Sequence, residues 1–174
     1  MPVTIREATA EDARAIAQVH VRSWRWAYRD LLPEDHLEKL SVDEREAMWR
    51  GGLSEPRPGW GCIVAEDDGG RVVGFAGFGS PEDATTAPYG AGELYAIYLD
   101  ERVAGTGVGR QVFGAAADAL RAAGFARAFL WVLAANERAR RFYEKAGWAW
   151  DGTTSTHRFD CANEPVVRYA VDLT

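Results

Sequence analysis

The segment ELYAIYLDERVAGTGVGRQVF, residues 93–113, constrains the fold of this chain more than any other part of it. An apolar strand runs into three closely spaced glycines and then directly into an amphipathic helix predicted over Val108–Ala123. The almost wholly apolar stretch Ala126–Leu133 follows, which is typical of a buried strand. A strand, a helix and a strand in this order form a βαβ unit, whose two strands are parallel. We therefore expect a layered α/β fold with helices packed on a sheet.

The glycine-rich turn between this strand and this helix is suited to binding a phosphate. Glycines let the backbone approach an anion closely, and the first N–H groups of a helix are unpaired donors at the positive end of its dipole. A nucleotide P-loop needs Gly-Lys-Ser/Thr, which is absent, and a Rossmann site needs an acidic residue where Leu133 to Asn136 stand. The turn therefore indicates a pyrophosphate site of another kind, or else a plain tight turn.

The rest of the chain supplies further strands and helices around this unit. The patterns predict the following elements: a strand at Val3–Glu7, a helix to about Tyr28 with Thr9 and Asp12 as a capping box, a helical stretch Pro33–Leu53 broken near Ser41, a hairpin of Gly61–Glu66 with Arg71–Gly79, a helix from Asn136 to Gly147, and strands at Trp148–Thr154 and Val166–Leu173 with Pro165 at the start of the last. We expect one domain over residues 1–174, of the α+β type within the α/β class. Its mixed, mostly antiparallel sheet should have about six to seven strands, a central βαβ unit and flanking helices.

Composition excludes several classes of function. With 47% hydrophobic and 26% charged residues the chain is globular, and its net charge of −6 disfavours nucleic acid as a partner. No apolar stretch is long enough for a membrane span or a signal peptide, which predicts no membrane partner and a cytoplasmic location. Cys62 and Cys161 stand far apart without neighbouring ligands, so we expect neither a disulfide nor a metal site.

Together with NERARRFYEKAGW at 136–148, the glycine-rich loop resembles the GCN5-related N-acetyltransferase (GNAT) superfamily, and the resemblance covers nearly the whole chain. It implies an acyl-CoA N-acyltransferase-like fold with acetyl-CoA as acyl donor and cosubstrate. The family pattern is Gln or Arg, two residues, Gly, one residue, then Gly or Ala. We prefer the register that places Gly107 and Gly109 at the two glycines and Ala104 at the first position, where Ala departs from the pattern. A second register begins at Arg102 and moves the glycines back by two.

The resemblance also implies which residues hold the cofactor. Backbone atoms of Ile97, Tyr98 and Leu99 should bind the pantetheine as though it were an added strand. The pyrophosphate cradle should consist of Ala104, Gly105, Thr106, Gly107, Val108, Gly109 and Arg110. In the family, Asn136 contacts the cofactor and Tyr143 lies beside its sulfur; the alternatives are that Asn136 is only a helix cap and Tyr143 only a core aromatic.

Acetylation of an amine needs a base for the amine proton and an acid for the departing thiolate. Tyr143 is the candidate acid, and Glu93 resembles family glutamates that act as the base, although it could also be a solvated strand-end charge. Trp24, Tyr28 and Glu93 are the candidate acceptor-binding residues, with core packing as the alternative role of Trp24. His20 has the pattern of a core histidine.

Three hypotheses follow. The first is an N-acetyltransferase, monomer or homodimer, that moves acetyl to a primary amine of a small molecule or peptide by direct attack in a ternary complex. The second is a catalytically weak CoA-binding regulatory module, and the third is an enzyme with Cys62 or Cys161 as nucleophile. We expect acceptor specificity to reside in loops at 51–61, 79–92 and 154–165.

Overall fold

The computed structural model describes residues 2–159 and 162–174. Its elements are β1 (Val3–Glu7), η1 (Ala10–Asp12), α1 (Ala13–Ala27), α2 (Glu34–Glu38), α3 (Val42–Ser54), β2 (Gly61–Asp67), β3 (Val72–Gly79), β4 (Ala91–Leu99), η2 (Glu101–Val103), α4 (Val108–Ala122), β5 (Arg127–Leu133), α5 (Glu137–Lys145), β6 (Ala149–Phe159) and β7 (Ala162–Asp172).

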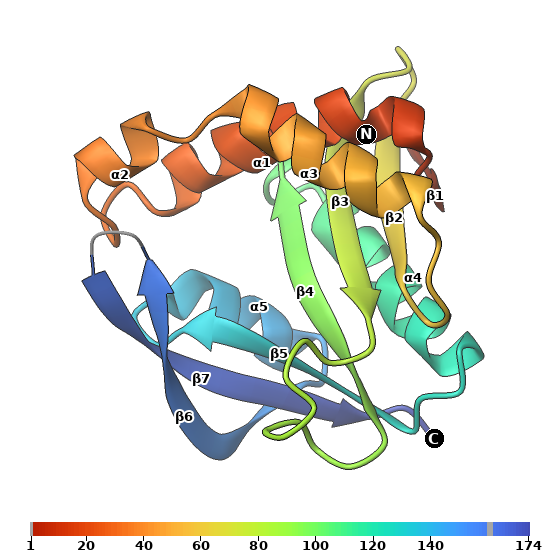
Figure 1. Ribbon diagram of the computed structural model, residues 1–174, viewed down its shortest axis with the longest axis vertical. Helices are drawn as coiled ribbons and strands as arrows, with labels where there is room; N and C mark the ends of the chain where they lie inside the picture. The colour runs from red at the N-terminus through yellow and green to blue at the C-terminus, as the bar shows by residue number, and fades with distance from the viewer. Residues whose placement is uncertain (1, 160–161) are drawn as a thin grey trace.

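The strands form one seven-stranded sheet in the order β1-β2-β3-β4-β5-β7-β6. Among the described residues β4 and β5 pair in parallel, joined by α4, and the other neighbouring strands pair antiparallel. The predicted mixed sheet with a central βαβ unit is therefore confirmed. Figure 1 shows that the sheet opens between β4 and β5 into two halves, β1–β4 and β5–β7–β6.

Helices cover both faces of the first half of the sheet (Figure 1). On one face α1 buries Ile16 and Val19 against Phe75 of β3, and α3 completes this core. On the other face α4 buries Val112 and Leu120, each 0% exposed, against the sheet. Each fully buried side chain of this size contributes roughly 1.5–3 kcal/mol to folding. These two cores fix the position of β4 between the helix layers.

Local signals in the sequence placed most helix ends correctly. Thr9 and Asp12 form the predicted capping box before α1. The predicted break near Ser41 is confirmed, because the Ser41 hydroxyl caps α3 by accepting the N–H of Glu44 at 3.2 Å. Gly147 has a φ of 91°, the left-handed conformation expected just after α5.

The predicted closing strands were too short, because β6 and β7 continue as a two-stranded ribbon. Pro165 consequently lies inside β7 and not at its start. Its carbonyl accepts the N–H of Ala134 at 2.9 Å, so its backbone polar groups face the side on which β5 has already ended at Leu133. The missing proline N–H therefore removes no ladder hydrogen bond.

Candidate active site

A cleft opens where β4 and β5 separate. The two strands pair only over Ala91–Glu93 and Arg127–Phe129, and then diverge (Figure 1). The pairing of β3 with β4 shifts register at Gly77/Phe78, which leaves Tyr95 as an extra residue and bends β4 at this point. Beyond Glu93, the edge of β4 that faces β5 has no strand partner among the described residues, and the cleft beside it has a volume of about 1370 Å³. An extended ligand could add to such an edge through backbone hydrogen bonds.

The glycine-rich turn lies at one end of this cleft and opens the N-terminus of α4. Gly105 and Gly107 have φ angles of 77° and 89°, a left-handed conformation in which other residues are strained. Gly107 is the N-cap of α4 and has no side chain that could cap the helix. Its carbonyl accepts the N–H of Gln111 at 3.2 Å. The N–H groups of the first turn are therefore donors placed at the positive end of the helix dipole.

This geometry separates two kinds of glycine in the loop. Gly109 lies inside the first turn of α4, where a Cβ would come within 2.7 Å of Leu99 Cδ1, so its small size serves packing. Gly105 and Gly107 are the two glycines of the loop with a left-handed φ. The Arg102 guanidinium is bound to Asp100, with Nε 2.9 Å from Oδ1, and Ala104 lines the cleft.

The other predicted cofactor residues differ in how they face the cleft. Ile97, Tyr98 and Leu99 line it, as do Gly105, Gly107, Gly109 and Arg110. The Thr106 hydroxyl donates to the carbonyl of Val103 at 2.6 Å, and the side chain of Val108 is buried in the α4 core. Only the backbone of these last two residues is suited to a ligand contact.

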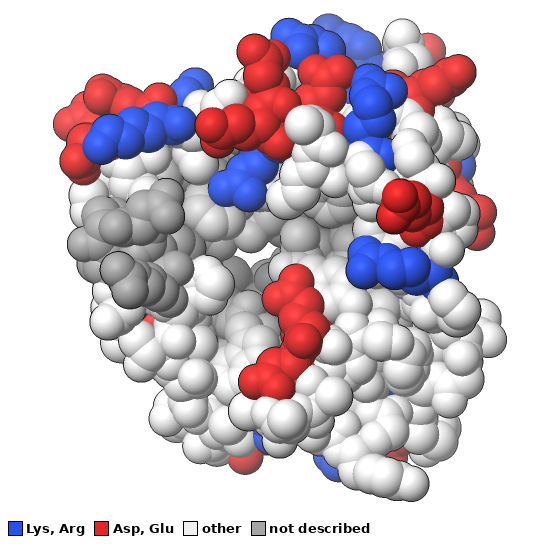
Figure 2. Space-filling model, in the orientation of Figure 1, with Lys and Arg blue, Asp and Glu red and all other residues white. Residues whose placement is uncertain are grey.

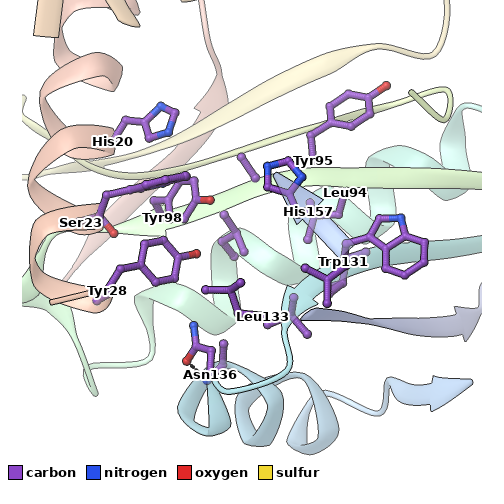
Figure 3. Close-up of a pocket in the computed structure, with 18 of the residues that line it drawn as sticks. His20, Ser23, Tyr28, Leu94, Tyr95, Tyr98, Trp131, Leu133, Asn136 and His157 are labelled. Carbon is purple, nitrogen blue, oxygen red and sulfur yellow. Dashed lines mark hydrogen bonds between the residues drawn. The ribbon is translucent and has the colours of Figure 1, made fainter. Parts of the chain in front are cut away.

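Asn136 and Tyr143 lie toward opposite ends of α5, and both line the cleft. Asn136 Oδ1 accepts the N–H of Ala139 at 3.1 Å, which confirms the predicted helix cap, and the side chain also lines the cleft (Figure 3). Tyr143 is 9% exposed and lines the cleft as well, with its ring packed on Phe113. Burial, and secondarily the neighbouring Tyr98, raise the pKa of Tyr143, so its phenol is protonated at neutral pH.

Glu93 is buried at the point where the strands separate. Its side chain lines the cleft and the residue is 6% exposed, so the alternative of a solvated strand-end charge is wrong. Burial is the main cause that raises the pKa of Glu93 from 4.5 to about 7, and the nearby carboxylates of Glu82 and Asp83 raise it further. A carboxyl with this pKa is poised to accept a proton near neutral pH.

Aromatic side chains form the wall of the cleft on the α1 side. Trp24 and Tyr28 both line it, with ring centroids 5.0 Å apart, and Figure 3 shows the hydroxyls of Tyr28 and Tyr98 pointing into the same space. His20 stacks on Tyr98 at 5.1 Å and accepts the Nε1–H of Trp49 at 3.2 Å. Burial, with a smaller effect of a nearby arginine, lowers the pKa of His20 to about 3, which confirms it as a neutral core histidine.

Several lining residues were not singled out in the sequence. They come from α3, from the end of β5, from the β3–β4 loop and from β6: Arg45, Trp49, Trp131, Glu82, Asp83, Thr154, Ser155, Thr156 and His157. The prediction of a specificity loop at 154–165 is wrong, since the described residues of this segment belong to β6 and β7. The side chains of Thr154 to His157 still line the cleft, as His157 does in Figure 3.

The structure gives no support to Cys62 as a nucleophile. Cys62 is 4% exposed within the α1 core, and burial raises the pKa of its thiol to about 12. A thiol that stays protonated is a poor nucleophile. Cys161 lies outside the described residues.

Comparison with known proteins agrees with this geometry. The sequence model described as Acetyltransferase (GNAT) family matches residues 15–148. The chain belongs to this family. The uncharacterized N-acetyltransferase YuaI of Bacillus subtilis is 42% identical over 134 residues, which are 77% of this chain and 73% of YuaI.

Solved structures of GNAT proteins share the fold. PaiA N-acetyltransferase from Thermoplasma acidophilum, in complex with coenzyme A, has a TM-score of 0.72 and 20% identity, over 97% of this chain and 98% of PaiA. An N-acetyltransferase from Staphylococcus aureus Mu50 has a TM-score of 0.73 and 24% identity over 100% of each chain. As a member of the GNAT family, this protein is an acetyl-CoA dependent N-acetyltransferase. It has the acyl-CoA N-acyltransferase-like fold. No helix in the described part of this GNAT chain is long and apolar enough to span a membrane.

Proposed function

We propose that this protein transfers an acetyl group from acetyl-CoA to a primary amine of a small molecule or peptide, by direct attack within a ternary complex. The observation that carries the proposal is Glu93, a buried carboxyl with a pKa near 7 at the fork between β4 and β5. A catalytic base is needed there because a primary amine is mostly protonated at neutral pH and cannot attack in that form.

The cleft offers a fitting place for the cofactor. The unpaired edge of β4 at Ile97–Leu99 would hold the pantetheine, and the first N–H groups of α4 beside Gly105 and Gly107 would hold the pyrophosphate. The Asn136 side chain would contact the same arm. When bound, the cofactor supplies the activated acetyl thioester.

Proton transfer would use two buried groups on different elements. Glu93 on β4 would take a proton from the acceptor ammonium, directly or through water, so that the neutral amine can attack. Tyr143 on α5 would donate its phenolic proton to the departing sulfur, because its raised pKa keeps that proton in place. Donors from the β4 backbone would stabilise the negative charge that develops on the carbonyl oxygen of the acyl group. Trp24 and Tyr28 would form the wall of the acceptor pocket.

The proposal is tested by thiol release from acetyl-CoA with a panel of chemically diverse amines. We expect release that depends on the amine and saturates with it. CoA binding without thiol release for any amine would favour the alternative of a catalytically weak regulatory module. Absence of any CoA binding at millimolar concentration would refute both. Light scattering on the same samples tests the proposed monomer or homodimer.

A further inference from the structure

We propose that the acceptor is an amine that also carries a carboxylate, namely an amino acid or short peptide, and that Arg45 binds this carboxylate. The inference rests on the proposed function and names the substrate class of the same site. It follows from charged side chains that line the cleft and form no ion pair among the described residues.

Arg45 projects from α3 into the wall of the cleft. Its guanidinium lies 6.0 Å from the ring centroid of Trp24, and its hydrogen bond is a weak one to Met48 Sδ at 3.9 Å. No carboxylate among the described residues lies within ion-pair distance of it. By contrast, Arg50 on the same helix binds Glu46 and the carbonyl of Ala10, and does not line the cleft.

The Arg45 charge lies on the same side of the sheet as the base. Along β4, Leu94 and Ile97 pack into the α4 core, whereas Tyr98 packs toward α1 and α3. Glu93, which precedes Leu94, faces the α1 and α3 side as well. Arg45 also affects the pKa of Tyr98. Burial raises this pKa, and the charge of Arg45 is one of the smaller effects that lower it. One pocket therefore holds a carboxyl and a guanidinium.

The other charges in the pocket reinforce its polarity. Glu82 and Asp83, on the loop between β3 and β4, add negative charge beside Glu93 and have no cationic partner among the described residues. Figure 2 shows acidic side chains on the loop side of the central hollow and a basic group at the opposite rim, beyond which acidic and basic side chains are interspersed. An acceptor with an ammonium at one end and a carboxylate at the other matches this arrangement.

The spacing of the two charges indicates an extended acceptor. Glu93 and Tyr98 are five positions apart on β4, which corresponds to roughly 16 Å along an extended strand. The side chains of Glu93 and Arg45 both line the cleft. An amine separated from its carboxylate by several bonds should therefore be acetylated better than glycine, in which the two groups are adjacent.

The experiment compares acids with their amides. Thiol release is measured with β-alanine, γ-aminobutyrate, ε-aminocaproate and diglycine, each beside the corresponding amide, for the wild type and for Arg45→Gln. We expect a higher kcat/KM for the longer acids than for their amides in the wild type, by roughly 10- to 100-fold, as for a hydrogen bond to a charged group. In Arg45→Gln this preference should disappear, because kcat/KM should fall far more for the acids than for the amides.

Matched variants distinguish the role of Arg45 from that of neighbouring arginines. Arg45→Lys should keep part of the preference, and Arg50→Gln should keep all of it. Arg57 also lines the cleft, stacked on Trp60 at 5.3 Å, so Arg57→Gln is compared directly. Equal rates for acids and amides in the wild type, an undiminished preference in Arg45→Gln, or its loss only in Arg57→Gln would each overturn the inference. The wild-type comparison stands even if Arg45→Gln does not fold. Thiol release from none of these or other amines would instead refute the proposed function.

Discussion

Replacing Glu93 by Gln keeps the size of the side chain and removes its titration. The pKa of Glu93 is near 7 in the folded protein and 4.5 when unperturbed, so the folded state retains a proton that the unfolded chain has lost between these values. Stability conferred by this group is therefore complete below pH 4.5 and falls as the pH rises through 7. At about 1.4 kcal/mol per pKa unit, the cost of the ionised Glu93 above pH 7 is about 3 kcal/mol.

The Gln variant does not bear this cost. We expect Glu93→Gln to be more stable than the wild type by up to about 3 kcal/mol at pH 8 and to show little difference at pH 4.5. Urea unfolding at both pH values measures this, with the exposed Glu38→Gln as a control that should change stability by less than about 0.5 kcal/mol at either pH. Activity should change in the opposite direction, with a lower rate at neutral pH that recovers in part at high pH. A Gln variant that is destabilised equally at both pH values, or that has an unchanged pH–rate profile, would refute the assignment of a buried base.

Three further variants test the acid, the cradle and the local charges. Tyr143→Phe keeps the packing of the ring and should lower kcat by about 10²-fold with cofactor affinity unchanged; a loss of less than about threefold in stopped-flow or steady-state assays would exclude Tyr143 as the acid. Gly107→Val and Gly124→Val each force a left-handed residue with open space around it, at a cost of at least about 1–2 kcal/mol, but only the first should weaken CoA binding in calorimetry. Equal CoA affinities of these two variants would contradict the cradle. Glu82→Gln removes a charge that raises the pKa of Glu93, so the acid limb of kcat/KM should move to lower pH; a shift to higher pH would contradict the sign.

The central part of the fold could be predicted because its signals are local. A glycine-rich turn between an apolar strand and an amphipathic helix determines the βαβ unit of β4, α4 and β5, and polar residues such as Thr9, Ser41 and Asn136 satisfy the backbone at helix starts. The same locality explains why Gly105 and Gly107 could be placed at the start of a helix. The β6–β7 ribbon was underestimated because Thr153 to His157 are polar on both faces and show no alternation.

The chemistry of the site depends on long-range pairing, which the sequence does not display. Whether Glu93 is buried depends on where β4 leaves β5, and this point is set by the bulge at Tyr95 opposite β3. The direction in which Arg45 points depends on how α3 sits over the sheet, since the alternation of polar and apolar residues on α3 is weak. For the glycine loop, the sequence does not show which glycines need a left-handed φ. The backbone angles identify Gly105 and Gly107, whereas Gly109 needs space.

The most direct test of the account is to follow CoA and the acceptor together in one reaction. The protein is mixed with acetyl-CoA and an amine, thiol release is recorded, and the amine is analysed by mass spectrometry at the same time points. We predict that no thiol is released without the amine, and that each equivalent of CoA formed is matched by one equivalent of N-acetylated amine. Thiol release that is independent of the amine, or tight CoA binding without acetylated product from any amine, would contradict direct acetyl transfer at this cleft.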